Sequence, residues 1–428
     1  MSELRCLGDI LDSISITHSF KKNKVIFLNT SDVLEGKILT HNYMLVSDLK
    51  GQAKKTIKNG DILFSEIRPK NKRYAYVELD NPEDYVVSTK LMVLRNKTTD
   101  VDTDYIYYFL TYSGMLDYLQ MRAENRICSF PQITFDVLRP IQVRVPNKGT
   151  QKKIAAVLSA LDAKIEVNNR INTQLEAMAK TLYDYWFVQF DFPNQDGKPY
   201  KSSGGKMVYN EVLKREIPEG WNVSALTAFV GLDKSGDWGK EESQGNYTQK
   251  VLCIRGADIN GINGKGEVNC PTRFILEKNE NKILKPFDIV IEISGGSPTQ
   301  STGRMAFITE RTIKRFNEQL ICSNFCKAIS LKDNSYFYYF VYLWNSIYDE
   351  NILFGWEGKT SGIKNLLFDA FVTNHHAVVP KASIAKSFFD LIAKIQDKKQ
   401  QNLAENQQLT QLRDWLLPML MNGQVKVS

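Results

Sequence analysis

The sequence predicts an α+β protein: two tandem α/β domains separated by two long helices that form an antiparallel, pseudo-twofold symmetric coiled coil. Three observations predict this class. A narrow apolar stripe runs through residues 151–188, the same stripe returns 234 positions later, and each stripe follows a globular segment of similar element order. A helix with such a stripe needs a facing helix to bury it. Two equivalent helices that leave equivalent domains satisfy this need most simply when they pack antiparallel.

Both long helices are predicted from apolar residues that alternate in steps of four and three, which is the 3.5-residue period of a coiled-coil seam. In the first helix the seam positions are Ile154, Leu158, Leu161, Ile165, Asn168, Asn172, Leu175 and Leu182. In the second helix they are Phe388, Ile392, Ile395, Asn402, Asn406, Leu409 and Leu416. Asparagines in the middle of a seam favour one register at some cost in stability. We therefore expect a single register for this helix pair.

The two globular segments share an order of short β-rich runs, a tyrosine-rich helix and a final strand. The run GDILFSEI at 60–67 is echoed by PFDIVIEIS at 286–294, and the tyrosine-rich stretch at 105–116 is echoed at 336–347. These near-constant offsets indicate a tandem duplication, with a period too long for a solenoid. We divide the chain into a first domain (1–150), a helix (151–189), a connector (190–216), a second domain (217–384) and a distal helix (385–428).

Composition describes an ordinary globular chain and excludes several classes. The 428 residues are 43% hydrophobic and 24% charged, and the net charge of +7 permits nucleic-acid binding without proving it. No apolar run is long enough to span a bilayer, and no signal pattern opens the chain, so we expect a cytoplasmic protein with no membrane partner. The six cysteines contain no CxxC pair, and the four histidines have no metal-ligand spacing. We expect no metal, no cofactor and no catalytic residue.

Several stretches carry a resemblance to a known family. These are QKKIAAVLSALDAKIEVNNRINTQLEAMAKTLYDYWFVQFDFP, MVYNEVLKREIPEGW (207–221), GDILFSEIRPK, VLCIRGADI (251–259) and RDWLLPMLMNGQV (413–425). They resemble the specificity subunit of type I restriction–modification systems. The resemblance covers the whole chain, with the helices as its most specific part, whereas the domains match mainly in layout.

The resemblance implies a non-catalytic subunit of an adenine-N6 DNA methyltransferase and restriction endonuclease complex. Each domain would be a target-recognition domain that reads one half of a bipartite, asymmetric target in double-stranded DNA. The coiled coil would set the spacer between the halves and dock two methyltransferase subunits, and motor–endonuclease subunits would join that core. Because the family diverges in its base-reading surfaces, the target itself does not transfer.

Candidate DNA-binding residues lie in polar or basic turns between the predicted strands, where side chains can meet phosphates or base edges. In the first domain they are Arg68, Lys70, Lys72, Arg73, Arg122, Arg126, Ser129 and Gln132. In the second domain they are Ser297, Thr299, Gln300, Ser301, Arg304, Lys359, Thr360 and Lys364. Solvated surface loops are the alternative for each of these turns. The tyrosine-rich helices offer rings for base stacking or, more simply, for core packing.

A different class of function also fits the helices. A structural adaptor would use the coiled coil to recruit proteins and the domains to bind protein ligands, without binding DNA. Sequence-specific DNA binding discriminates the two hypotheses. Near the helix ends, Trp186, Phe187 and Trp415 are aromatic residues that fit either a methyltransferase contact or packing of a domain on its helix.

Overall fold

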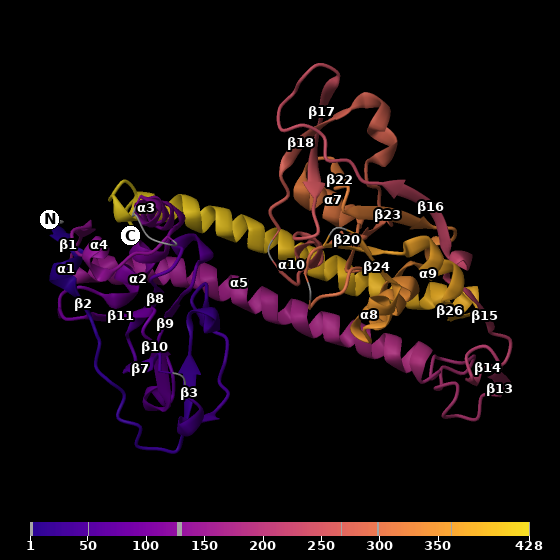
Figure 1. Cartoon of the computed structure of the whole chain (residues 1–428), viewed down its shortest axis with the longest axis horizontal. Coiled ribbons are helices and arrows are strands. Elements are labelled where there is room, and N and C mark those ends of the chain that lie inside the picture. The colour runs from indigo at the N-terminus through magenta and orange to yellow at the C-terminus, as the bar shows by residue number, and fades with distance from the viewer. Residues whose placement is uncertain are drawn as a thin grey trace. The chain divides into compact units, whose positions relative to one another are not determined.

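A computed structural model describes residues 3–49, 51–125, 131–266, 268–297, 299–360 and 362–427 (Figure 1). The chain divides into two compact units. Unit 1 comprises Met1–Ile165 and Gln408–Ser428, and unit 2 comprises Glu166–Gln407. Each unit thus combines one globular segment with a part of both long helices. Both units combine sheets with helices, so the predicted α+β class is confirmed.

Unit 1 contains two four-stranded sheets and two short two-stranded pairs. One sheet has the order β2 (Leu11–Ser13), β11 (Leu91–Asn96), β8 (Ile62–Ser65) and β9 (Tyr74–Tyr76), with every pair antiparallel. The other has the order β6 (Met44–Leu45), β3 (Lys24–Leu28), β10 (Tyr85–Ser88) and β7 (Ala53–Thr56), in which only β10 and β3 are parallel. Two short antiparallel pairs are β1 (Glu3–Cys6) with β12 (Gln142–Val145) and β4 (Val33–Leu34) with β5 (Lys37–Ile38).

The helices of unit 1 bury the tyrosine-rich stretch that the sequence singled out. They are α1 (Leu7–Ile10), α2 (Thr103–Thr111), α3 (Ser113–Glu124) and α4 (Phe135–Leu138). Helix α2 begins after Asp102, whose carboxylate accepts a hydrogen bond from the backbone N–H of Tyr105. Tyr105 and Tyr108 belong to the hydrophobic core, and their hydroxyls donate hydrogen bonds to Arg144 O and Asp162. These rings therefore pack the core of unit 1 and are not available for stacking on bases.

Unit 2 contains a larger set of sheets, most of whose pairs are antiparallel. The first has the order β16 (Val230–Ser235), β23 (Cys326–Leu331), β19 (Ile289–Glu292) and β21 (Met305–Phe307). The second has the order β18 (Thr272–Leu276), β17 (Tyr247–Ile254) and β22 (Leu320–Cys322), with β17 and β22 parallel. The third has the order β20 (Ser294–Gly295), β25 (Ile363–Leu366) and β24 (Glu357–Thr360). Two-stranded pairs are β13 (Met207–Asn210) with β14 (Arg215–Pro218) and β15 (Asn222–Ala225) with β26 (His376–Val379).

Aromatic packing dominates the helices of unit 2. They are α6 (Ile259–Ile262), α7 (Glu310–Phe316), α8 (Phe337–Asp349) and α9 (Phe368–Asn374). Helix α8 carries the second tyrosine-rich stretch and lies against both long helices (Figure 1). Tyr342 stacks on Tyr183 with ring centroids 6.0 Å apart, and its neighbours Tyr338 and Tyr339 are buried as well. The second set of tyrosines is therefore also core.

The two units repeat one topology, as the sequence offsets predict. Strand order and pairing are the same in β2-β11-β8-β9 and β16-β23-β19-β21, and again in β6-β3-β10 and β18-β17-β22. The terminal pair β1·β12 matches β15·β26 in the same way. The three-stranded sheet β20-β25-β24 of unit 2 is larger than its counterpart in unit 1. Within the described residues, the pairing of β20 with β25 corresponds to the isolated bridge between Ile67 and Gln132. A shared topology lets loops be compared between the units position by position.

The long helices are α5 (Lys148–Tyr183), which continues into a π-helical turn at Asp184–Val188, and α10 (Ala382–Met421). They run antiparallel where they meet. In unit 1, Asp162 of α5 pairs with Arg413 of α10 at 2.8 Å, and in unit 2 Asn172 pairs with Asn402 at 2.9 Å. None of the predicted seam residues is exposed. Among the described residues, no helix is long and apolar enough to cross a membrane.

Candidate nucleic-acid interface

Three chain segments of unit 1 meet where β8 ends. The first is the basic turn, residues 66–73, which joins β8 to β9. The second is the turn between β10 and β11, because Glu66 N–H donates to Lys90 O at 3.1 Å. The third precedes α4: Ile133 N–H donates to Glu66 O at 2.8 Å, and Arg68 N–H donates to Pro131 O at 3.1 Å. Backbone hydrogen bonds therefore hold these segments together as one surface.

The basic turn has a constrained backbone that fixes where its cations point. Arg68 and Lys72 both adopt the left-handed conformation, with φ of 45° and 53°, on either side of a single 3₁₀ turn at Pro69–Asn71. Non-glycine residues rarely adopt this conformation, and such positions cluster at functional sites. This strain identifies the turn as a feature that the surrounding structure holds in place.

The predicted cations of this turn differ in what they already bind. Arg73 donates to Ser31 O at 2.9 Å and to Val33 O at 3.3 Å, so its guanidinium fastens β9 to a neighbouring loop. Lys72 pairs with Glu35 and Lys70 with Asp117, in both cases between side chains more than 40% exposed. Exposed pairs of this kind contribute only about 0–1 kcal/mol and exchange readily for a phosphate. Arg68 is exposed, and within the described ranges no side-chain partner is found for it.

Helix α3 borders the same surface. Gln120 accepts a hydrogen bond from Lys70 N–H at 3.3 Å, which attaches the helix to the basic turn. Arg122 is exposed in the last turn of α3, where the partial negative charge of the helix end stabilises a cation. Gln132 donates to Glu66 at 2.7 Å and so serves the structure of the turn. Arg126 and Ser129 lie outside the described residues.

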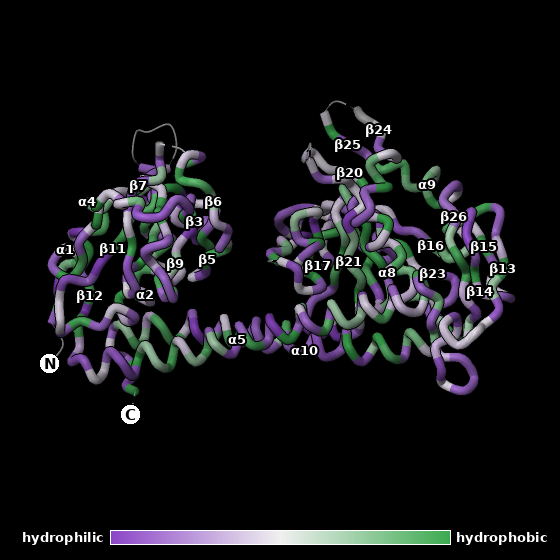
Figure 2. The backbone as a smooth tube through the Cα atoms, turned by 90° about the horizontal axis from the view of Figure 1, so that it is seen from below, coloured by the Kyte–Doolittle hydropathy of each residue, from purple (hydrophilic) through white to green (hydrophobic). Residues whose placement is uncertain are grey.

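The equivalent surface of unit 2 forms where β19 ends, around the segment 293–304. Ser297, Thr299 and Gln300 are exposed there, and a Cβ added to Gly296 would meet no atom within 4 Å. Figure 2 shows β20, β24 and β25 at the end of unit 2 that lies farthest from α5 and α10. Backbone without bulky side chains can approach a duplex closely, and its N–H groups suit phosphate oxygens.

Other predicted residues of unit 2 hold this loop in shape. Arg304 forms a bidentate ion pair with Glu292, both contacts at 2.8 Å, and Ser301 is buried. Lys364 pairs with Glu357 at 3.1 Å and places its ammonium 4.8 Å from the ring centre of Phe354, with only 12% of its side chain exposed. In the backbone of β24, Lys359 faces Lys364 and Thr360 faces Ile363. Arg304, Ser301 and Lys364 are thus engaged within the protein, while Ser297, Thr299 and Gln300 are open to a ligand.

One turn at this surface did not appear among the sequence-based candidates. The β22–β23 turn lies against β20, because Ile293 N–H and Ser294 N–H both donate to Phe325 O, at 2.9 and 3.1 Å. Its counterpart in unit 1 is the β10–β11 turn that carries Lys90. No sequence signal distinguishes this turn, because Phe325 lies within a β-rich run.

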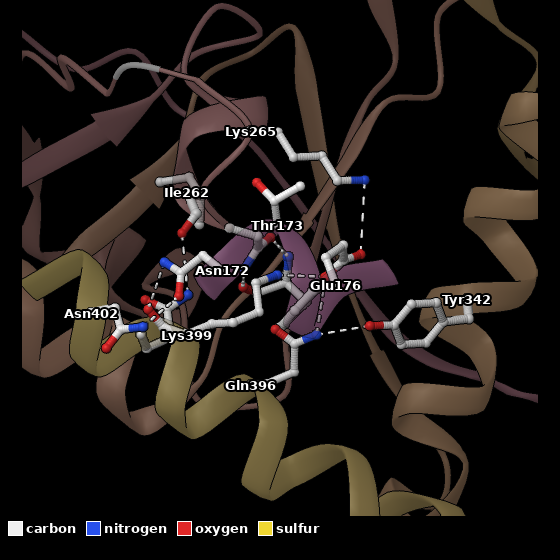
Figure 3. Close-up of polar contacts among 12 residues, drawn as sticks. Asn172, Thr173, Glu176, Ile262, Lys265, Tyr342, Gln396, Lys399 and Asn402 are labelled. Carbon is white, nitrogen blue, oxygen red and sulfur yellow. Dashed lines mark hydrogen bonds and ion pairs between the residues drawn. The ribbon is translucent and has the colours of Figure 1, made fainter. Parts of the chain in front are cut away.

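The helix pair carries a polar cluster in unit 2 (Figure 3). Asn168 donates to Asn406 at 2.9 Å, and Glu176 forms an ion pair with Lys399, whose side chain is 3% exposed. Burial raises the pKa of the Glu176 carboxyl, but the neighbouring ammonium of Lys399 outweighs this effect and holds that pKa below its usual range. Glu176 is therefore ionised at neutral pH, and its charge fixes which residue of α10 lies opposite.

Aromatic residues near the helix ends fall into two groups. Trp186 and Phe187 are buried in the core of unit 2, where Phe187 packs edge-on against Phe388 with ring centroids 4.9 Å apart. They pack the second domain on its helices. Trp415, by contrast, is 58% exposed on α10 and lies beside exposed Leu412.

Comparison with known proteins decides the family. Residues 2–177 match the family described as type I restriction modification DNA specificity domain. The chain is 30% identical to the type I restriction enzyme HindI specificity subunit of Haemophilus influenzae, over 98% of both chains. The chain belongs to the family of type I restriction–modification specificity subunits. Specificity subunits are the non-catalytic, DNA-recognising components of these systems.

Two further relatives of this specificity subunit agree. The type I restriction enzyme MjaIX specificity subunit of Methanocaldococcus jannaschii is 26% identical over 77% of this chain and 70% of its own. A crystal structure of a type I restriction–modification system S subunit from M. genitalium aligns with a TM-score of 0.51 at 16% identity, over 98% of this chain and 96% of that one. The structural likeness supports the fold. Within the described residues, no group of three or more His, Cys, Asp or Glu side chains is arranged to hold a metal ion.

Arg68 offers a direct test of the interface in unit 1. Replacing it with glutamine removes one cation that has no structural role, so the dependence of log K on log salt concentration should become shallower by about 0.9. Stability should change by less than about 0.5 kcal/mol. Lys201→Gln, an exposed lysine of the connector, is the matched control and should keep the original slope. An unchanged slope in the Arg68→Gln variant would place this residue outside the DNA contact.

Proposed function

We propose that each unit reads one half of a bipartite, asymmetric target in double-stranded DNA, through the surface at the end of β8 in unit 1 and of β19 in unit 2. The observation that carries this proposal is that two units of one topology present different chemistry at the same place. The basic turn of unit 1 offers Arg68 and Lys70, whereas the matching segment of unit 2 offers Ser297, Thr299 and Gln300. Different side chains select different bases, so the two half-sites differ.

The long helices supply the second part of the proposed function. In symmetric DNA-binding dimers, the protein geometry sets the separation of the half-sites. Here α5 and α10 pass from one unit into the other, so their length sets the spacer between the half-sites. Facing polar pairs such as Asn172 with Asn402 support one register, and hence one spacer length.

Partner subunits follow from the family and from exposed apolar side chains on the helices. We infer that two methyltransferase subunits dock on the helical region and that motor–endonuclease subunits join this assembly. Trp415 and Leu412 are exposed in unit 1, and Met178 and Tyr185 are exposed in unit 2. Met178 and Leu412 are 234 positions apart and thus occupy equivalent places in the duplicated helices. Two apolar patches that share this equivalent position suit two copies of one partner, with an aromatic residue as an anchor in each.

Domain exchange tests this function. Replacing residues 1–150 with the first domain of another family member should change one half-site of the modified sequence and leave the other half-site and the spacer unchanged. A change in both halves would contradict independent reading by the two units. The adaptor hypothesis predicts a different result, namely that neither the parent nor the exchanged protein binds DNA with sequence preference.

A further inference from the structure

The turn between β22 and β23 combines a fixed backbone with an exposed aromatic side chain. Ser323 and Cys326 are each 1% exposed, and Cys326 N–H donates to Ser323 O at 2.9 Å. Ser323 N–H also donates to Ile254 O at 2.9 Å. Phe325, at the tip of this anchored turn, is 51% exposed. The ring is therefore presented to solvent from a rigid support.

The surroundings of this turn are open and polar. Phe325 O accepts hydrogen bonds from the first residues of the segment 293–297, in which two glycines follow Ser294. Gly295 pairs with Lys364 in the next strand, and the ammonium of Lys364 lies over the ring of Phe354, itself 38% exposed. Backbone with small side chains therefore lies near exposed aromatic rings, while the Lys364 ammonium stays paired with Glu357. This is the combination that nucleic-acid sites use for backbone contact and base stacking.

Comparison with unit 1 shows that the fold does not require an aromatic residue here. Lys90 occupies the equivalent position and accepts the equivalent backbone hydrogen bond, from Glu66 N–H at 3.1 Å. The Lys90 side chain is 41% exposed, with its ammonium 3.9 Å from the Glu66 carboxylate. One position therefore carries a cation in unit 1 and an exposed ring in unit 2, and its carbonyl accepts an equivalent backbone hydrogen bond in both units. A single exposed apolar residue is common on protein surfaces. Phe325 differs because it lies at the surface that we propose contacts DNA.

We propose that Phe325 packs its ring against a base step of the half-site that unit 2 reads, partly unstacking that step. Apolar side chains of proteins that deform DNA act as wedges in this way. The inference rests on the proposed function, since it names a residue that determines specificity within the second reading surface. The two surfaces then differ in their dependence on salt. Lys90 of unit 1 contributes a salt-dependent contact with phosphate, whereas Phe325 of unit 2 contributes a contact that is insensitive to salt.

The experiment uses the full chain assembled with its methyltransferase subunits and duplexes that contain its own modified sequence. 2-Aminopurine replaces, one at a time, bases of the second half-site other than the modified adenine, and fluorescence is read with the DNA saturated by protein. The parent assembly should enhance fluorescence at one base step. Phe325→Ala should abolish that enhancement and weaken binding about 5- to 100-fold, without a change in the salt slope.

Two further variants sharpen the result. Leu232→Ala removes another exposed apolar side chain of unit 2, on β16, and should leave both affinity and fluorescence unchanged. Phe325→Lys introduces the residue found in unit 1, so it should steepen the salt slope by about 0.9 without restoring the fluorescence. Phe325→Ala with parental affinity and fluorescence would overturn the inference while leaving the proposed function intact. Failure of the parent assembly to prefer its own sequence would overturn both.

Discussion

Replacing Glu176 with leucine is expected to destabilise unit 2 by about 3–5 kcal/mol, because it leaves the ammonium of Lys399 buried without a counter-charge. The nearest other groups do not compensate. Gln396 donates to Tyr342, and Lys265 adds a second positive charge on the far side of Glu176, at 3.9 Å. Five of the six tryptophans belong to unit 2, so intrinsic fluorescence in a urea titration reports mainly on this unit.

Replacing the lysine of this pair instead should destabilise unit 2 less. Lys399→Met removes the buried charge and keeps an unbranched side chain, while Glu176, with 23% of its side chain exposed, keeps access to water and to Lys265. The double variant should recover much of the loss, because an apolar pair of similar volume avoids the cost of removing both charges from water.

An exposed ion pair of the same unit provides the control for these variants. Lys180 and Asp349 are both 57% exposed, so Asp349→Asn should change stability by less than about 0.5 kcal/mol. Equal effects of Glu176→Leu and Asp349→Asn would show that the buried pair does not hold the helices together.

Removing one heptad from each long helix is expected to shorten the DNA spacer by about three base pairs while both half-sites stay the same. Seven helical residues span about 10 Å, and successive base pairs are about 3.4 Å apart. Residues 163–169 of α5 and 404–410 of α10 are suitable, because the facing asparagines Asn168 and Asn406 leave together.

After this deletion, the contacts between α5 and α10 on either side of it keep their register. Asp162 still faces Arg413 on one side, and Asn172 still faces Asn402 on the other. The spacer is read from the sequences that the assembled methyltransferase modifies. A variant with the heptad removed from α5 alone breaks the facing pairs and should lose modification altogether. If the double deletion modifies sites with the original spacer, the helices do not set the spacing.

Much of this architecture is predictable from sequence because it depends on periodicity. The 3.5-residue stripe and its return after 234 positions predict two facing helices, and the order of β-rich runs predicts the duplicated α+β units. The sequence predicts a connector at 190–216 without indicating how it packs; in the structure Phe192 stacks on Trp221 and Asp191 accepts hydrogen bonds from Ser202. Composition alone did not reveal this packing, because Trp221 is far from Phe192 along the chain and because a small polar residue such as Ser202 is also common in loops.

The reading surfaces were harder to resolve, because a basic residue in a turn looks the same whether it faces solvent or a buried acid. Arg304 and Lys364 have carboxylate partners in Glu292 and Glu357, which only the folded strands bring together. The pairing of Lys399 with Glu176 likewise depends on the facing helix. Phe325 was missed because an isolated aromatic residue in a β-rich run usually marks the core, and only the structure shows this ring exposed.

We propose above all that this chain directs adenine methylation to a split DNA sequence. The most direct measurement is to co-express the chain with its methyltransferase partner in a host without adenine methylation and to map modified adenines across the genome by single-molecule sequencing. We expect one motif made of two unlike halves, separated by a gap of fixed length, with an adenine modified in each half. A stable complex of the two proteins that leaves the genome unmodified, or that modifies a continuous or symmetric motif, would contradict it.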